Sequence, residues 1–246
     1  MKKNDEIAIT VKDLHVYYRD MNRFSLKRSG VKGRGSGKIF KALKGVSFEV
    51  PKGQILGICG KNGSGKSTLL RAISGIFSPD SGSINLHGNT ISLLSIGVGF
   101  QKKLTGYENI YLSGMLLGYS KEQIDEKVDE IIEFSELGDF VYKPVSSYSS
   151  GMYSKLAFSI TAILETDIML IDEVLSVGDI HFKEKSYNKM KELISDSDRT
   201  VVIVSHSTKT IVELCDKVIW LHDGLIKDEG KPEEIMEKYE SFMRQD

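Results

Sequence analysis

The stretch "GKNGSGKST" constrains the fold of this chain more than any other part of its sequence. It occupies Gly60–Thr68, follows the apolar run "QILGIC" and leads into "LLRAISGIF", which has helical spacing. Gly60, Gly65, Lys66 and Ser67 match the P-loop pattern, in which a glycine-rich loop joins a strand to a helix. The sequence therefore predicts an α/β fold with a mostly parallel sheet.

The residues of this loop are those that phosphate binding requires. Glycines let backbone N–H groups turn toward phosphate oxygens, and the helix that starts near Ser67 adds the positive end of its dipole. Lys66 would act catalytically by placing its charge at the β- and γ-phosphates, and the Ser67 hydroxyl would ligate Mg²⁺. We expect nucleotide contacts from the whole loop: Gly60, Lys61, Asn62, Gly63, Ser64, Gly65, Lys66, Ser67 and Thr68. The similar "GRGSGK" at Gly33–Lys38 fails, because Lys32 and Ile39 replace the required glycine and hydroxyl.

Two later strands end in side chains that would complete a nucleotide site. The run "DIMLIDE" delivers Asp172 and Glu173 at its carboxyl end, where α/β sheets place their ligands. We expect Asp172 to hold Mg²⁺ and Glu173 to polarise the attacking water. The run "TVVIVSH" ends at His206, for which a γ-phosphate contact is favoured over a structural role.

The composition describes a globular chain with no strong charge bias. Its 246 residues are 40% hydrophobic and 27% charged, and the formal net charge is -1, which favours neither nucleic acid nor an anionic membrane as a partner. Cys59 and Cys215 lie in apolar stretches and are expected in the core. The N-terminus lacks a signal-like apolar segment, and no apolar run reaches the roughly 18 residues of a membrane span, so a soluble or peripheral protein is expected.

The order of elements predicts one α/β domain over 1–246 with antiparallel strands near its N-terminus. "IAITVKDLHVYY" and "FKALKGVSFEV" are predicted strands, and the basic, glycine-rich Arg19–Lys38 between them is a predicted inserted loop. One amphipathic helix is predicted for residues 121–138, with Ile124, Val128, Ile131 and Ser135 on one stripe and Gly138 as its stop.

A second candidate anion site begins at "YSSGM". Ser149, Ser150 and Gly151 open a predicted helix, and a hydroxyl, a glycine and a helix N-terminus together suit phosphate. One nucleotide already has its loop, so a second site would be shared between two copies of the chain. An ordinary serine cap of the helix explains the same residues, and the residues alone leave both interpretations open.

The combined motifs resemble the ATP-binding cassette (ABC) ATPases. The order matches over nearly the whole chain: "GKNGSGKST", "YSSGM", "IMLIDE", "LSVGD" and the switch "SH". The resemblance implies an ABC-type nucleotide-binding domain with an N-terminal antiparallel β subdomain and a helical subdomain at about residues 101–160. It also implies a homodimer that sandwiches two ATP molecules, each between one P-loop and the partner's Ser149–Gly151. Gln101 would contact nucleotide and Mg²⁺, and Tyr18 would stack on adenine, with Phe40 as a substitute.

Three further stretches narrow this resemblance. "GVGFQKKLTGYENIYL", "EFSELGDFVYKPV" and "DEVLSVGD" are similar to the ATPase subunits of bacterial exporters of O-antigen and teichoic acid. Such a subunit would be peripheral at the cytoplasmic face of the cell membrane, with separate transmembrane permease subunits and a lipid-linked glycan as cargo. No C-terminal carbohydrate-binding domain is expected. The basic Arg19–Lys38 loop would meet anionic headgroups or a carrier's pyrophosphate, or be a solvated loop.

The main alternative is an ABC ATPase that serves a small-molecule or peptide transporter. An ABC protein of DNA repair would need a long coiled coil between Lys66 and Asp172, for which the chain has no room. A GTPase would need a carboxylate to read guanine, but "NKMK" ends in Lys191. A cassette that only binds nucleotide would lack Glu173 or His206, and both are present.

Overall fold

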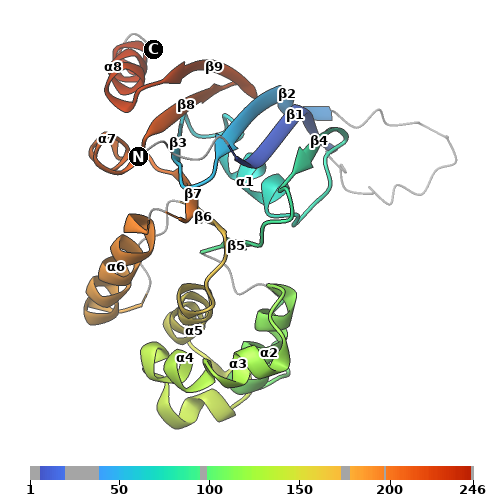
Figure 1. Ribbon diagram of the computed structural model, residues 1–246, viewed down its shortest axis with the longest axis vertical. Helices are drawn as coiled ribbons and strands as arrows, with labels where there is room; N and C mark the ends of the chain where they lie inside the picture. The colour runs from blue at the N-terminus through green and yellow to red at the C-terminus, as the bar shows by residue number, and fades with distance from the viewer. Residues whose placement is uncertain (1–5, 20–38, 95–98, 173–177, 197, 245–246) are drawn as a thin grey trace, which may run out of the picture.

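The computed structural model describes residues 6–19, 39–94, 99–172, 178–196 and 198–244. Its strands form two sheets, one of six strands and one of three (Figure 1). Three sequence predictions fall wholly or partly outside the described residues: the inserted basic loop, from residue 20 to residue 38, the acid Glu173, and residues 175–177 of the motif "LSVGD". Within the described part, the expected α/β architecture is confirmed.

The six-stranded sheet carries the nucleotide-binding segments that the sequence predicts. Its order is β5 (Ile91–Leu93), β6 (Ile168–Asp172), β7 (Thr200–Val204), β3 (Ile55–Cys59), β8 (Lys217–His222) and β9 (Leu225–Gly230). All neighbours are parallel except β8 and β9, which form an antiparallel hairpin. Strands β3 and β7 are apolar except for Thr200 because the sheet is covered on both faces.

The two faces of this sheet are covered by different layers. One face packs on α1 (Lys66–Ile73) and on the small antiparallel sheet, in the order β2 (Ile39–Pro51), β1 (Ile7–Arg19) and β4 (Ser81–Asn85). The other face packs on α6 (Ile180–Ser195), α7 (Thr208–Leu214) and α8 (Pro232–Met243). Figure 1 shows these helices opposite the small sheet. The expected antiparallel strands near the N-terminus are thus confirmed.

The remaining helices form a lobe of their own at the lower end of Figure 1. They are α2 (Gly106–Leu116), α3 (Lys121–Asp125), α4 (Val128–Ser135) and α5 (Ser150–Ile163), with 3-10 turns η1 (Gly138–Tyr142) and η2 (Val145–Ser147). This lobe has its own apolar core, which includes Ile110, Ile131, Leu156 and Ile160. The helix predicted to open at Ser149–Gly151 is therefore α5, and it belongs to this lobe.

The prediction of one helix over residues 121–138 is wrong. The segment breaks between α3 and α4, and Lys127, which precedes α4, has a φ of -113°, more negative than in a regular α-helix. The break lets α3 pack on α2, where Ile124 covers Gly114, while α4 packs on α5. The predicted stripe is nevertheless buried as expected. The helix ends at Glu136, whose φ is +58°, rather than at Gly138.

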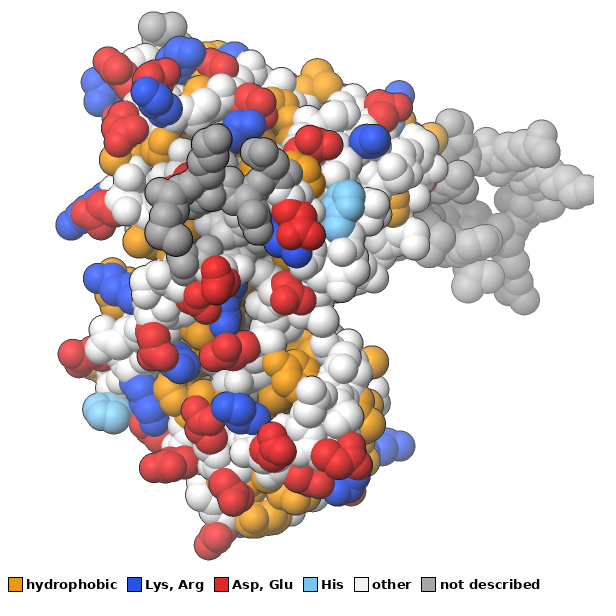
Figure 2. Space-filling model, in the orientation of Figure 1, with side chains coloured by type: hydrophobic (Ala, Val, Ile, Leu, Met, Phe, Trp, Pro, Cys, Tyr) orange, Lys and Arg blue, Asp and Glu red, His pale blue; other side chains and the backbone are white. Residues whose placement is uncertain are grey.

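The burial of the two cysteines and the mixed charges of the surface agree with what the composition predicts. Cys59 and Cys215 are buried free thiols, as expected, and burial raises the pKa of each to about 12. The face in Figure 2 carries acidic and basic side chains interspersed rather than a single basic stripe. Among the described residues, no helix combines the length and the apolar composition that a membrane crossing needs.

An ion-pair network joins α4, α5 and α6. Lys155 Nζ lies 3.1 Å from Glu136 Oε2 and 2.8 Å from Asp179 Oδ2, and its side chain is only 13% exposed. Lys185 and His181 also approach Glu136. The hydrogen bond from Lys155, with one from the Phe182 N–H, lowers the pKa of Asp179 to about 2. Helices α5 and α6 are therefore linked through Lys155.

Replacing Lys155 with methionine should lower Tm at pH 7 by about 2–4 °C. Because the pKa of Asp179 is depressed when folded, its contribution is present above the unfolded value of about 3.9 and is lost as pH falls toward about 2. The Tm difference between wild type and variant should therefore shrink below about pH 4. Lys127→Met, which removes an exposed pair with Glu130, is the matched control. A Tm difference that does not change with pH would show that the ion pair between Lys155 and Asp179 is not its cause.

Candidate functional site

The P-loop folds tightly because glycines occupy the positions that other residues could not adopt. Gly60 has a φ of +151°, and a Cβ there would lie 2.2 Å from the carbonyl oxygen of Leu221 on β8. Gly65 has a φ of +108° and caps α1, and a Cβ there would lie 2.7 Å from the Ala42 carbonyl. The loop is thus pressed against β8 and β2, which leaves its N–H groups available on the open side.

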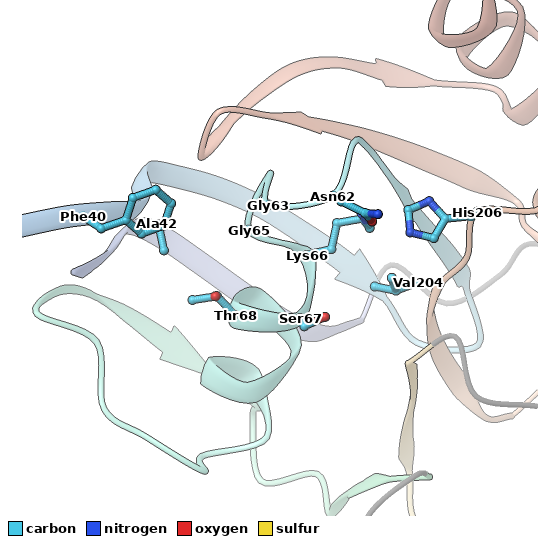
Figure 3. Close-up of a pocket in the computed structure, with 10 residues that line it drawn as sticks. All are labelled: Phe40, Ala42, Asn62, Gly63, Gly65, Lys66, Ser67, Thr68, Val204 and His206. Carbon is cyan, nitrogen blue, oxygen red and sulfur yellow. The ribbon is translucent and has the colours of Figure 1, made fainter. Parts of the chain in front are cut away.

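A pocket opens along this loop (Figure 3). Its lining combines the loop with strand β2 and with β7 and the residues just after it: Phe40, Ala42, Asn62, Gly63, Gly65, Lys66, Ser67, Thr68, Val204 and His206. Six of the nine residues predicted from the loop therefore line the pocket. Gly60, Lys61 and Ser64 do not. Gly63 faces open space, because a Cβ there would meet no atom within 4 Å.

Lys66 is the buried cation of the pocket. Its Nζ donates to the carbonyl oxygens of Gly60 at 2.7 Å and of Lys61 at 3.0 Å, so the loop itself orients the ammonium group. Burial lowers the pKa of Lys66, while the thiol of Cys59 and the carboxylate of Asp172 act in the opposite direction. Among the described residues, the hydrogen-bond acceptors of this ammonium group are backbone carbonyls, so it is poised to gain from an anionic partner.

Ser67 and Asp172 meet as the sequence predicts. Ser67 Oγ donates to Asp172 Oδ1 at 3.5 Å, which brings the first turn of α1 to the carboxyl end of β6. Parallel strands β3 and β6 end at the same edge of the sheet, which explains the meeting across 105 positions of sequence. Glu173 follows directly in sequence but lies outside the described residues.

His206 closes the opposite end of the pocket from Phe40 (Figure 3). It lies two residues beyond the end of β7, so its position past a strand end was correctly predicted. Burial and the nearby charge of Lys66 lower its pKa, which favours the neutral imidazole at pH 7. A neutral ring can donate or accept a hydrogen bond beside the lysine without repelling it.

Two aromatic side chains stand at the β2 end of the pocket. Tyr18 and Phe40 are partners across the β1–β2 ladder, and both are exposed, at 43% and 58%. Phe40 lines the pocket, whereas Tyr18 reaches the loop through its hydroxyl, 3.2 Å from Thr68 Oγ1. The structure thus places both predicted candidates beside the same end of the loop.

Gln101 lies in the helical lobe and does not line the pocket. Its backbone is fixed by Asn109, which the sequence analysis did not identify. Asn109 Oδ1 accepts from the Gln101 N–H at 2.7 Å, and its amide group donates to the carbonyls of Gln101 and Thr105 at 3.1 and 2.7 Å. Asn109 is fully buried on α2, so a polar residue on an apolar helix face was the signal that could have revealed it.

Replacing Asn109 with leucine should reduce the free energy of unfolding by about 2–4 kcal/mol, because buried groups lose their hydrogen bonds. Leucine has the same branching and the same number of side-chain heavy atoms as asparagine, so the loss would not report a cavity. Urea unfolding measures the change, with Asn188→Leu on the exposed face of α6 as the control. Equal stability of both variants would show that Asn109 does not hold the Gln101 turn.

Ser149, Ser150 and Gly151 also lie outside the pocket. Ser149 caps α5 by accepting from the Met152 N–H at 3.2 Å, as either interpretation of the sequence requires. Figure 1 shows the start of α5 in the helical lobe, away from α1. Within one chain, therefore, the P-loop and the predicted second anion site do not form one site.

The profile of the ABC transporter family matches residues 43–176, more than half of the chain. The chain belongs to the ABC transporter family. The match begins within the second strand of the small sheet and runs through the P-loop and the helical lobe past Asp172, so it includes the pocket residues that the P-loop supplies, but not Phe40 or His206. The resemblance seen in the sequence is confirmed, and the fold is a nucleotide-binding ABC domain.

Curated relatives fall in the narrower group that the sequence resembles. The O-antigen export system ATP-binding protein RfbB of Myxococcus xanthus is 43% identical over 82% of this chain and 46% of its own length. The teichoic acids export ATP-binding protein TagH of Lactococcus lactis is 46% identical over 84% of this chain and 44% of its own length. The chain spans about half the length of these relatives.

Solved structures confirm the ABC fold. The ATP-binding cassette MJ0796, solved as a dimer in a post-hydrolysis state with ADP and phosphate, superposes with a TM-score of 0.68 at 22% identity. The superposition covers 91% of this chain and 98% of that one. At this identity the likeness concerns the fold, which here includes both the large sheet and the helical lobe.

Proposed function

We propose that this ABC domain is the ATP-hydrolysing subunit of a transporter that exports lipid-linked polysaccharide across the cytoplasmic membrane. The observation that carries the proposal is the pocket in which Lys66, Ser67 and His206 converge on a loop shaped for phosphates. The export functions in the names of the relatives support the choice of cargo.

The lining residues suit ATP in one orientation. Lys66 and the open N–H groups around Gly63 would hold the β- and γ-phosphates, with His206 beside the γ-phosphate. Phe40 lies at the far end of the pocket, where it would stack on adenine, and its ladder partner Tyr18 would flank it. Glu173 would orient the attacking water, as predicted from its place after Asp172.

The donor set also fits Mg²⁺. This ion is held by few protein oxygens together with substrate phosphates, and it neutralises charge on the transferring phosphoryl group. A hydroxyl and a carboxylate, those of Ser67 and Asp172, already meet at 3.5 Å beside the pocket. Gln101 would complete the ligands by moving toward the pocket with the helical lobe. Lys66 would then release its loop carbonyls and contact phosphate oxygens.

A second copy of the chain is required for the proposed site to be complete. Ser149–Gly151 present a capped helix start that lies outside the pocket of the same chain, and the dimeric state of the solved cassette supports pairing. We propose a homodimer at the cytoplasmic face of the membrane that drives separate permease subunits. The inserted basic loop stays a prediction from sequence, as a contact for anionic lipid or carrier headgroups.

Depletion of the protein in its host tests the cargo directly. We expect lipid-linked glycan to accumulate in the cytoplasmic membrane, and wild-type protein but not Lys66→Ala should clear it. Mass spectrometry of extracted lipids would identify both glycan and carrier. If no lipid-linked glycan accumulates while the purified protein hydrolyses ATP, the polysaccharide assignment is wrong and the alternative of a small-molecule or peptide transporter holds.

A further inference from the structure

The C-terminal helix α8 packs beside the nucleotide pocket, although none of its residues was assigned a role by sequence. Ile235 and Met236 on its inner face are both 1% exposed, which fixes the helix on the large sheet. Trp220 of β8 stacks edge-on against Tyr239 and Phe242, with ring centroids 5.5 and 5.3 Å away. The last turn of α8 is therefore held rigidly next to β8.

Phe242 reaches the P-loop from this position. Lys61 Nζ lies 5.5 Å from the centroid of the Phe242 ring, within the range of a cation–π contact. The same residue, Lys61, offers its carbonyl oxygen to Lys66 Nζ at 3.0 Å. A continuous set of contacts thus leads from α8 through Lys61 to the ammonium group in the pocket. Lys227 of β9, 3.3 Å from the same ring centroid, ties the ring to the edge of the sheet.

Glu240 contacts the segment that follows His206 in sequence. Its Oε1 accepts a hydrogen bond from Thr208 Oγ1 at 2.6 Å. Thr208 is the first residue of α7, and Ser207 caps that helix by accepting from the Thr210 N–H. His206 precedes this cap directly. β3 and β7 are neighbouring parallel strands, so the segments that follow them start side by side, and the phosphates would lie between these segments. α8 therefore contacts both the P-loop, which follows β3, and the segment after His206, which follows β7.

We propose that Phe242 and Glu240 are positioning residues of the nucleotide site. Together they set the distance between the P-loop and the segment that carries His206. Phe242 acts through Lys61 on the orientation of Lys66, which contacts phosphate in the bound state and so governs affinity. Glu240 acts through the start of α7 on His206, which governs turnover. The inference rests on the proposed nucleotide site and is independent of the cargo.

Matched variants separate positioning from packing. Phe242→Leu keeps an apolar side chain but removes the aromatic face, while Phe242→Tyr restores that face. Glu240→Ala removes the acceptor for Thr208, while Glu240→Gln keeps an oxygen that can accept. Lys238 lies on the same helix as Phe242 but away from the pocket, and its Nζ lies 2.6 Å from Asp228 Oδ2. Lys238→Ala, which breaks this ion pair, is the control. The measurements are the Kd of a fluorescent ATP analogue, KM and kcat for ATP, and Tm.

We expect Phe242→Leu to raise Kd and KM about three- to tenfold with little change in kcat. Glu240→Ala should lower kcat by a similar factor with little change in Kd. The tyrosine and glutamine variants should recover wild-type values within about twofold, and Lys238→Ala should match wild type. If affinity and kcat fall in proportion to Tm in every variant, including Lys238→Ala, then α8 has only a structural role and the inference is wrong.

Lys66→Ala distinguishes this inference from the proposed function. If Lys66→Ala loses ATP binding while Phe242→Leu and Glu240→Ala behave as wild type, the inference is wrong and the nucleotide site stands. If Lys66→Ala binds ATP as tightly as wild type, the nucleotide site itself is wrong, and the role of α8 is overturned with it.

Discussion

Replacing Lys66 with alanine should weaken ATP binding by about a hundredfold or more and abolish measurable hydrolysis, because a buried charge aimed at the phosphates is removed. Lys66 is 6% exposed, so no neighbouring lysine can reach its place without moving the loop. Binding is measured with a fluorescent ATP analogue, and turnover by phosphate release.

Two controls accompany this variant. Lys209→Ala removes a lysine whose side chain is 82% exposed on α7, and it should leave binding and turnover unchanged. Tm is measured beside activity, because Lys66→Ala leaves the carbonyls of Gly60 and Lys61 without the hydrogen bonds that Lys66 donates. Hydrolysis at the wild-type rate in Lys66→Ala would show that the reaction takes place elsewhere.

The parts of the fold that sequence predicts well are those with a strong local pattern. Strands β3, β6 and β7 are largely apolar runs next to polar loops, and all three were predicted, β3 together with the helix that follows it. The sequence analysis did not identify β4, β5, β9 and α2. β9 alternates exposed and half-buried residues at the sheet edge, yet the Asp223-Gly224 turn, with φ of +48° and +79°, was a hairpin signal.

The functional site likewise has parts that the sequence predicts and parts that it does not. The P-loop is contiguous in sequence, so its residue types predict its geometry, and Asp172 and His206 follow from the rule that ligands gather at the carboxyl ends of strands. Asn109 could not be linked to Gln101 from sequence, because that contact depends on where α2 packs. The contact of Phe242 with Lys61 spans most of the chain and depends on the register of β8 and the tilt of α8.

The helix break near Lys127 has a similar origin. Residues 121–138 have uniform helical spacing, and no glycine or proline interrupts them before Gly138. Two different neighbours, α2 and α5, determine the directions of α3 and α4. Glu136 then caps α4 with a left-handed φ, and its carboxylate pairs with Lys155 and Lys185. Tertiary contacts therefore override a helical pattern that is locally consistent.

A site shared between two copies predicts that two inactive variants restore each other. Gly151→Asp should fold normally, because a Cβ at Gly151 meets only Ser149 Oγ, at 3.8 Å, and an acid suits the first turn of α5. Its carboxylate would repel the partner's bound phosphates, so hydrolysis alone should fall about a hundredfold or more. Lys66→Ala is expected to be inactive for a different reason, since it removes the ammonium group of the P-loop and keeps Ser149–Gly151 intact.

Mixing the two variants in equal amounts should restore activity. A mixed dimer contains one site built from the intact P-loop of the Gly151→Asp chain and the intact helix start of the Lys66→Ala chain. About half of the dimers would be mixed, each with one working site of two, so about a quarter of the wild-type rate is expected for independent sites. Differently tagged chains verify that subunits exchange. If each site were contained within one chain, Gly151→Asp alone would be fully active. Mixing would then add no activity, because the Lys66→Ala chain would have no working site.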